Sequence, residues 1–200
     1  MAGDAWLAAR RTEVAAEKIL DAAEQLFAEH DPAAVGMREI ARAAGCSRAT
    51  LYRYFDNREA LHTAYVHRWA NTLYRQLGGI LAGIDDPHQR LITGITESLA
   101  LVRGNPALAS WFTKTGPPIG AELAERSDMI ATMVAAFLSA LGLDEAGAAA
   151  EVVQQRARWV VRVLTSLLIF PGRDAADERA MLAEFVVPAV AGTARRQATQ

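Results

Sequence analysis

The chain has 200 residues, 52% of them hydrophobic, with alanine prominent and no long Gly/Ser tract. That length is enough to bury a sizeable core in one large or two small domains. The formal net charge of −2 excludes a protein that coats nucleic acid with a basic surface along its whole length.

Apolar residues recur at intervals of three and four between Glu13 and His30, which predicts an amphipathic helix. Asp31-Pro32 ends this helix because proline cannot continue it. Residues 1–12 are expected either to be loose or to extend the helix at its beginning.

Residues 37–58 predict two short helices around a tight turn. The first runs from Met37 to Ala44, and Gly45 ends it because glycine accepts the left-handed backbone that a helix C-terminus commonly needs. Ser47 follows as an N-cap, since its hydroxyl can accept from the free amides of the next turn. Cys46, in the turn, is expected to be a small packed residue rather than a redox or metal site.

The second helix of the pair runs from Arg48 to about Tyr54 and turns Leu51 and Phe55 inward, four residues apart. Its remaining faces are left to arginine, tyrosine, threonine and alanine. Two helices joined by a glycine-containing turn of three or four residues form a helix-turn-helix, the geometry with which many proteins read DNA.

The composition of this segment agrees with that geometry. Five arginines stand against Glu39 and Asp56, a local excess of three positive charges, and hydroxyl side chains lie between them. Such groups donate to phosphate oxygens, while a few side chains at the start of the second helix can read base edges. The alternative is a solvated helical pair with an ordinary charged face. The arginines are Arg38, Arg42, Arg48, Arg53 and Arg58, and the hydroxyls belong to Ser47, Thr50, Tyr52 and Tyr54.

The segments ILDAAEQLFAEH and MREIARAAGCSRATLYRYFDNREAL resemble the N-terminal domain of TetR-family transcriptional regulators, over roughly residues 17–61. The resemblance implies that recognition-helix residues contact DNA and that Arg38 and Arg58 contact phosphates. Gly36 stands where the family often has a capping Ser or Thr, so a hydroxyl contact is missing there. The expected DNA-binding residues are Arg38, Ser47, Arg48, Ala49, Thr50, Tyr52, Arg53, Tyr54 and Arg58. Acidic residues of the preceding helix are expected to face away from phosphate: Glu13, Glu17, Asp21, Glu24 and Glu29.

A long helix follows, capped by Asn57 and beginning at Arg58, and Gly78-Gly79 predicts a break or bend near its end. One stripe of this helix carries Leu61, Tyr65, Trp69 and Leu73.

Every later segment also reads as a helix, and no strand-like alternation appears. One helix is expected to start at Asp86-Pro87, with an apolar stripe of Leu91, Ile92, Ile95, Leu99 and Val102. The later ones are a short helix beginning at Asn105-Pro106, 119–141, 145–170 with Asp144 as its cap, and a last helix capped by Asp174 and kinked at Pro188. Turns are expected at Gly116-Pro117-Pro118 and at Gly142, and a frayed tail from Arg195.

These patterns predict an all-α fold of about nine helices. Residues 1–57 would form an N-terminal three-helix, helix-turn-helix DNA-binding domain. Residues 58–200 would form a C-terminal helical bundle that carries dimerisation and a ligand pocket.

The helix predicted over 145–170 is apolar almost all round in its second half, so it needs neighbours on most sides. Pairing the last two helices with their symmetry mates would form a four-helix face and make a homodimer. The family resemblance implies the same dimer, with two heads on half-sites of a palindromic operator about 34 Å apart. The alternative for these helices is an ordinary intrachain core.

The central helices could enclose a cavity for a small-molecule effector, although aromatic residues and methionines at helical spacing are more often plain core. Arg162, between two valines, wants a partner if buried: a ligand carboxylate, an acidic side chain or solvent at the dimer rim. The candidate ligand-binding residues are Trp69, Ile95, Leu99, Trp111, Phe112, Met129, Met133, Phe137, Trp159 and Arg162. The resemblance implies that effector binding would shift the helix beginning at Arg58 and release DNA.

An enzyme is not expected, because no nucleophile–base pair, paired acids or metal cluster stands out. His62 and His67 are five residues apart, not the three or four that place two ligands on one helical face, and no cofactor is expected. The remaining alternative is a protein–protein adaptor that keeps the head without specific DNA binding.

A cytoplasmic location is expected. The lone cysteine fits a reducing compartment and excludes an internal disulfide. No signal peptide is visible, since charged residues follow Arg10-Arg11 where an apolar run would be needed. The longest apolar stretch, residues 159–170, is broken by Arg162 and falls short of the ~20 residues that span a membrane.

Overall fold

The computed structural model describes residues 2–113, 118–143 and 149–191, with side chains from residue 12 onward. Every regular element within these residues is helical, so the all-α prediction is confirmed. None of the described helices is both long and apolar enough to cross a membrane.

The chain begins with α1 (Ala2–Glu29), α2 (Met37–Ala43), α3 (Arg48–Tyr54) and α4 (Arg58–Leu81). It continues with α5 (Pro87–Gly104), α6 (Pro106–Ala109), the 3-10 helix η1 (Ser110–Phe112), α7 (Ile119–Arg126), α8 (Asp128–Leu141) and α9 (Ala150–Ile169). It closes with α10 (Ala175–Met181), the π-helical turn η2 (Leu182–Val186) and α11 (Val187–Ala191).

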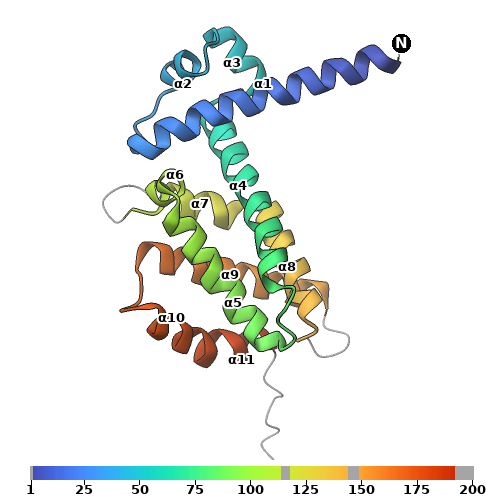
Figure 1. Ribbon diagram of the computed structural model, residues 1–200, viewed down its shortest axis with the longest axis vertical. Helices are drawn as coiled ribbons and strands as arrows, with labels where there is room; N and C mark the ends of the chain where they lie inside the picture. Colours follow the sequence, from blue (N-terminus) through green and yellow to red (C-terminus); the bar gives the residue numbers. More distant parts are fainter. Residues whose placement is uncertain (1, 114–117, 144–148, 192–200) are drawn as a thin grey trace, which may run out of the picture.

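Figure 1 shows an elongated molecule with α1, α2 and α3 at one end and α10 and α11 at the other. The long helix α4 runs from the first group down through the middle of the molecule, beside α5 and α8. We call α1–α3 the head and the remaining helices the body.

Side-chain N-caps are present at four helix starts, and those at Asn57, Asp86 and Asp174 were predicted. In each case a side-chain oxygen accepts a hydrogen bond from the backbone amide three residues on, which satisfies one of the free donors at the helix N-terminus. These caps are Asn57 for α4, Asp86 for α5, Asn105 for α6 and Asp174 for α10.

The single helix predicted over 119–141 is wrong, because α7 and α8 are separated at Ser127. The backbone of Ser127 is extended, and its hydroxyl accepts from the amide of Ile130 to cap α8. The same hydroxyl lies 2.9 Å from Nε2 of His67 on α4. With α6 running into η1, and α10 running through η2 into α11, the described residues form ten helices where about nine were predicted.

Other boundaries also differ from the predictions. Helix α4 continues through Gly78 and Gly79 to Leu81, so the glycine pair does not break it. Helix α1 begins at Ala2, which is the second of the two alternatives predicted for residues 1–12. A kink was predicted at Pro188, and the structure has a π-helical turn just before it, where proline has no amide to donate to the preceding turn. Helix α9 begins at Ala150, while Asp144, the turn at residues 116–117 and the tail from Arg195 lie outside the described residues.

Two apolar cores hold the described residues together. The first joins the head to the upper part of α4 and to α6 and η1, with Phe27, Leu51, Leu61 and Trp111 among its members. The second lies in the body, where Leu99 of α5 packs among α8, α9 and the last helices. Apolar packing therefore continues across residue 57, and the domain boundary placed there stays a prediction.

Arg103 on α5 ties the last helices to the body. Its guanidinium donates to both carboxylate oxygens of the buried Glu178 on α10, at 2.7 and 2.9 Å, and to the carbonyl of Leu167 on α9 at 2.8 Å. The guanidinium lowers the pKa of the Glu178 carboxyl.

Candidate nucleic-acid interface and small-molecule cavity

The turn between α2 and α3 has the geometry that glycine permits. Gly45 has φ of +65°, in the left-handed region, and its amide donates to the carbonyl of Arg42 at 3.1 Å. The next amide, that of Cys46, donates to the carbonyl of Ala41 at 2.9 Å. This pair of bonds is the Schellman motif that ends many helices. The Cys46 side chain is partly buried and packs against the first core, as predicted.

Helix α3 is fixed from behind and at its start. Leu51 is fully buried and Phe55, which follows the helix, is also buried, as the spacing predicted. The amide of Thr50 donates to the hydroxyl of Ser47 at 3.0 Å, so the predicted cap is present. Gly36, at the start of α2, offers no side-chain cap.

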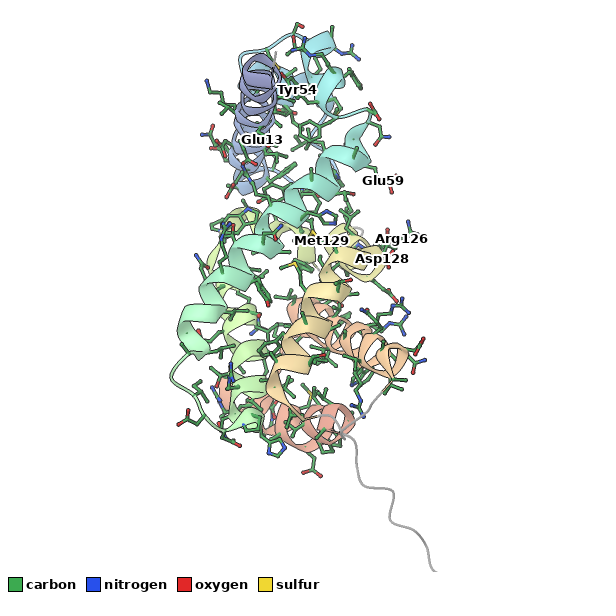
Figure 2. The ribbon with its side chains drawn as sticks, turned by 90° about the vertical axis from the view of Figure 1, so that its right-hand side faces the viewer. Glu13, Tyr54, Glu59, Arg126, Asp128 and Met129 are labelled. Carbon is green, nitrogen blue, oxygen red and sulfur yellow. The ribbon has the colours of Figure 1, made fainter. Side chains whose placement is uncertain are left out.

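The other side of α3 is open to solvent. Most of the predicted DNA-binding residues are exposed there or nearby, while Thr50 and Tyr54 are half-buried. Figure 2 shows Tyr54 in the part of the molecule farthest from the last helices. The exposed members are Arg38, Ser47, Arg48, Ala49, Tyr52, Arg53 and Arg58.

Neighbouring side chains hold several of these groups in place. The Arg48 guanidinium lies 5.9 Å from the centre of the Tyr52 ring, and that of Arg53 lies 5.2 Å from the Tyr54 ring. Arg53 also donates to the Tyr54 hydroxyl at 3.3 Å. A cation over an aromatic face is attracted to it, which favours these arrangements.

Arg58 has a structural contact that the sequence did not reveal. Its guanidinium is exposed, yet one nitrogen donates to the carbonyl of Ala33 at 2.8 Å and so holds the loop after α1 against the start of α4. The other nitrogen atoms of the fork leave it able to bind a phosphate as well.

The acidic residues of α1 are held by one basic side chain of α4. The guanidinium of Arg68 forms ion pairs with Glu17, Asp21 and Glu24, at 3.1, 2.7 and 2.7 Å. The negative charge of these carboxylates is therefore balanced by Arg68 within the molecule. The sequence had predicted only that the carboxylates would face away from phosphate.

A cavity of about 350 Å³ opens in the body among α4, α5, α7, α8 and α9, with η1 beside it. Its wall is mostly aliphatic and aromatic. Six of the ten predicted ligand-binding residues line it: Trp69, Ile95, Trp111, Phe112, Met133 and Phe137.

The other four predicted residues lie outside this cavity. Leu99 is buried in the second core. The sulfur of Met129 lies 4.0 Å from the side-chain amide nitrogen of Asn71. Trp159 is 47% exposed, and Arg162 is exposed and paired with Glu125. On α9 the cavity side is taken by Val160, Val161 and Leu164, so the neighbouring positions turn away from it.

Arg90, on the first turns of α5, lines the cavity although the sequence analysis did not single it out. A signal was present, because Arg90, Gly94, Ser98 and Val102 follow one another at intervals of four and so share a helical face. All four line the cavity.

Trp111 belongs both to the cavity wall and to the core of the head. Its ring centre lies 5.0 Å from that of Phe27 on α1, 4.8 Å from that of His62 and 5.4 Å from that of Tyr65. A molecule in the cavity would therefore touch a ring that also packs against the head.

His62 sits in this aromatic cluster in its neutral form. Its side chain is buried, and Nε2 has no hydrogen-bond partner among the described residues. Burial, together with the charge of Arg58, lowers the pKa of His62 to about 4.

Large apolar side chains are exposed on the last helices. Trp159 and Val152 of α9 are 47% and 38% exposed, and Phe185 of η2 is 65% exposed. Phe170, just after α9, is 64% exposed. Large contiguous patches of exposed apolar surface mark contact sites in soluble proteins.

Comparison with known proteins decides the family. The model of the bacterial regulatory proteins of the tetR family matches residues 19–65, which include the helix-turn-helix. An uncharacterized HTH-type transcriptional regulator of Mycobacterium tuberculosis, Rv1255c, is 62% identical over 200 residues, covering 99% of this chain and 97% of the relative. The chain belongs to the TetR family.

More distant proteins also match over most of the chain. The HTH-type transcriptional regulator AlkX of M. tuberculosis is 27% identical over 175 residues, covering 86% of this chain and 83% of the relative. The crystal structure of the TetR family repressor AlkX from a Dietzia strain, implicated in biodegradation of n-alkanes, is 25% identical. It superimposes with a TM-score of 0.60 and covers 86% of this chain and 93% of that one. The family and the 62% identical relative are transcriptional regulators, not enzymes.

Proposed function

We propose that this TetR-family regulator is a cytoplasmic repressor that binds a palindromic operator as a homodimer and leaves it when an apolar effector enters the body cavity. The observation that carries the proposal is the exposed face of α3, rich in arginine and tyrosine and anchored from behind by Leu51 and Phe55. An exposed guanidinium and phenol surface on a helix-turn-helix is suited to phosphates and base edges.

The roles of the individual residues follow from their places on the head. Arg48 and Tyr52 stand on the exposed face of α3 and would reach bases in the major groove, with the methyl of Ala49 available to a thymine methyl. Arg38 and Arg58 flank that face and would bind phosphates. Ser47, Thr50, Arg53 and Tyr54 would complete the contacts from the same helix and its cap.

The exposed apolar surface on the last helices supports a homodimer. Pairing α9 and the helix from α10 to α11 with their symmetry mates would cover Val152, Trp159 and Phe185. Two heads related by twofold symmetry would then address the two half-sites of an operator.

The position of Trp111 supports a link between the cavity and the head. An effector that displaced this ring would also disturb Phe27 of α1 and Tyr65 of α4, against which the ring packs. Release of DNA requires the effector to bind one arrangement of the heads better than the other. The relation of the Dietzia AlkX to n-alkane degradation agrees with an apolar effector.

Selection of bound DNA from random sequence would supply the operator, and variants of α3 would then test the interface. Arg48→Ala and Tyr52→Ala should each reduce binding to the selected operator at least about fivefold in a gel shift, since a good base contact contributes about 1–3 kcal/mol. Circular dichroism should find both variants folded, because both side chains are exposed.

Arg126→Ala is the matched control, because this exposed arginine ends α7 in the body, away from the head (Figure 2). Operator binding that survives both α3 substitutions, or falls equally with Arg126→Ala, would refute the assignment of α3. Phosphate contacts make DNA affinity fall steeply as the salt concentration rises. A protein–protein adaptor would not show this steep fall.

A further inference from the structure

The largely apolar wall of the cavity contains a charged side chain at Arg90. Among the described residues that line it, Arg90 is the one charged side chain. Its Nε is buried and has no hydrogen-bond partner, and none of the ion pairs of the described residues involves Arg90. A guanidinium that borders an apolar space without a counter-ion favours the entry of an anion.

Two of the hydroxyl groups on the cavity wall, those of Ser98 and Thr165, do not compete for this role. Ser98 donates to the carbonyl of Gly94 at 2.6 Å, and Thr165 donates to the carbonyl of Arg162 at 3.1 Å. Both hydroxyls are thus engaged within their own helices, and the remaining wall is largely aliphatic and aromatic.

Arg90 and Trp111 mark opposite ends of an elongated space. Along α5 the lining residues run from Arg90 to Val102, a span of about 18 Å at the rise of an α-helix. Near Arg90 the wall is made by Leu81 and Gly94 with the ring of Phe137, and past Val102 it continues to Trp111. A cavity of about 350 Å³ drawn out over such a length is narrow.

We infer that the effector is an apolar chain ending in a carboxylate, bound with the carboxylate at Arg90 and the chain directed toward Trp111. This inference deepens the proposed function, on whose cavity it rests. The fork of N–H donors on a guanidinium matches a carboxylate, and the apolar wall matches an alkyl chain. A neutral alcohol of the same length would offer the guanidinium an acceptor but no counter-charge, and an alkylammonium would be repelled by it.

Calorimetric titration of the full-length protein with decanoate and with decan-1-ol tests the assignment. The wild type should bind decanoate at least about tenfold more tightly than decan-1-ol, since a hydrogen bond between charged groups is stronger than a neutral one. Arg90→Gln should remove this preference by weakening decanoate binding while leaving decan-1-ol binding unchanged. Arg90→Lys, which keeps the charge, should retain part of the preference.

Arg126→Gln is the control for a loss of surface charge. It should leave both affinities unchanged, and retained decan-1-ol binding shows that the Arg90→Gln cavity is intact. Equal affinity of the wild type for acid and alcohol, no binding of either, or an equal loss in Arg126→Gln would overturn the inference.

A gel shift of the unliganded wild type on its selected operator separates this inference from the repressor proposal. If the unliganded protein fails to bind DNA, the repressor proposal is refuted while a carboxylate preference at Arg90 still stands. If DNA is bound but acid and alcohol bind equally, the repressor proposal stands and the assignment of Arg90 is refuted.

Discussion

His62 places a titratable ring where water does not reach it. The ring lies edge-on to Phe27 at 5.6 Å and to Trp111 at 4.8 Å between centres, and the side chain is 4% exposed. A charged imidazole would lose its hydration there without gaining a partner. The start of α4 therefore carries a base, packed against the head, that stays neutral at neutral pH.

The lowered pKa of His62 predicts how the free energy of unfolding depends on pH. Above the unfolded pKa of about 6.5 the ring is neutral in both states and has no effect. As pH falls from about 6.5 toward about 4, the unfolded state binds the proton first, so stability decreases by an amount on the order of 3 kcal/mol.

Urea unfolding at a series of pH values measures this effect. His62→Phe keeps an aromatic ring but removes the titratable group. This variant should lose the part of the pH dependence that falls between pH 6.5 and 4. His88→Gln, at an exposed histidine of α5, should keep it. Identical pH profiles for the wild type and His62→Phe would contradict the assignment.

At the scale of elements, two glycines with opposite requirements stand in the first four helices. Gly45 ends α2 in the left-handed region, with φ of +65°. Gly79 lies inside α4, and a Cβ there would meet nothing within 4 Å. The backbone conformation at position 45 requires glycine, whereas the helical backbone at position 79 accepts other residues.

Alanine substitutions at these two positions should change stability in opposite directions. Gly45→Ala should destabilise the protein by about 1–2 kcal/mol, because an L residue in the left-handed region is strained. Gly79→Ala should stabilise it by about 0.5–1 kcal/mol, because alanine loses less backbone entropy in a helix. Thermal unfolding followed by circular dichroism measures both, and changes of the same sign would contradict this account.

The helices that the sequence predicted well are those with local signals. Three helix starts could be predicted from capping residues, namely Ser47, Asn57 and Asp86. The buried side of α3 could be predicted from the spacing of Leu51 and Phe55. The break at Ser127 was missed because the apolar spacing continues on both sides of it, although Ser127 is a serine N-cap like Ser47. Its hydroxyl also lies 2.9 Å from Nε2 of His67, and that contact, 60 residues away in sequence, leaves no local pattern. The same limit applies to Arg90, whose importance depends on four other helices meeting around it.

In the whole molecule, α4 carries residues of both structural regions. Leu61 and Tyr65 are fully buried in the core of the head, while Trp69 and Leu73, further along the same stripe, line the cavity. The sequence predicted the stripe but not its division, because periodicity reveals a face and not what covers each part of it. Likewise, it could not separate Trp111, inside the cavity wall, from Trp159, on the surface.

The proposed homodimer predicts the effect of charge on the exposed apolar surface. Light scattering should give the wild type twice the 21.6 kDa mass of the chain at micromolar concentration. Trp159→Glu combined with Phe185→Glu should give a folded monomer, because carboxylates would be buried at the interface without partners. Ile80→Glu, at an exposed apolar residue of α4, should leave the dimer intact.

A monomeric wild type would refute the interface, and so would a dimer that is indifferent to both glutamates. If Ile80→Glu also dissociates the dimer, the effect of the two glutamates cannot be assigned to an interface on α9 and the last helices.

The shared position of Trp111 also constrains how this protein could acquire a new effector. Mutations that reshape the wall around Trp111 would disturb the packing of Phe27 and Tyr65 and so weaken the DNA-reading end at the same time. Mutations around Arg90 carry no such penalty, because none of the described contacts of Arg90 reaches the head. Evolution and biosensor design alike should therefore find new ligand specificities by varying the Arg90 end and preserving the tryptophan.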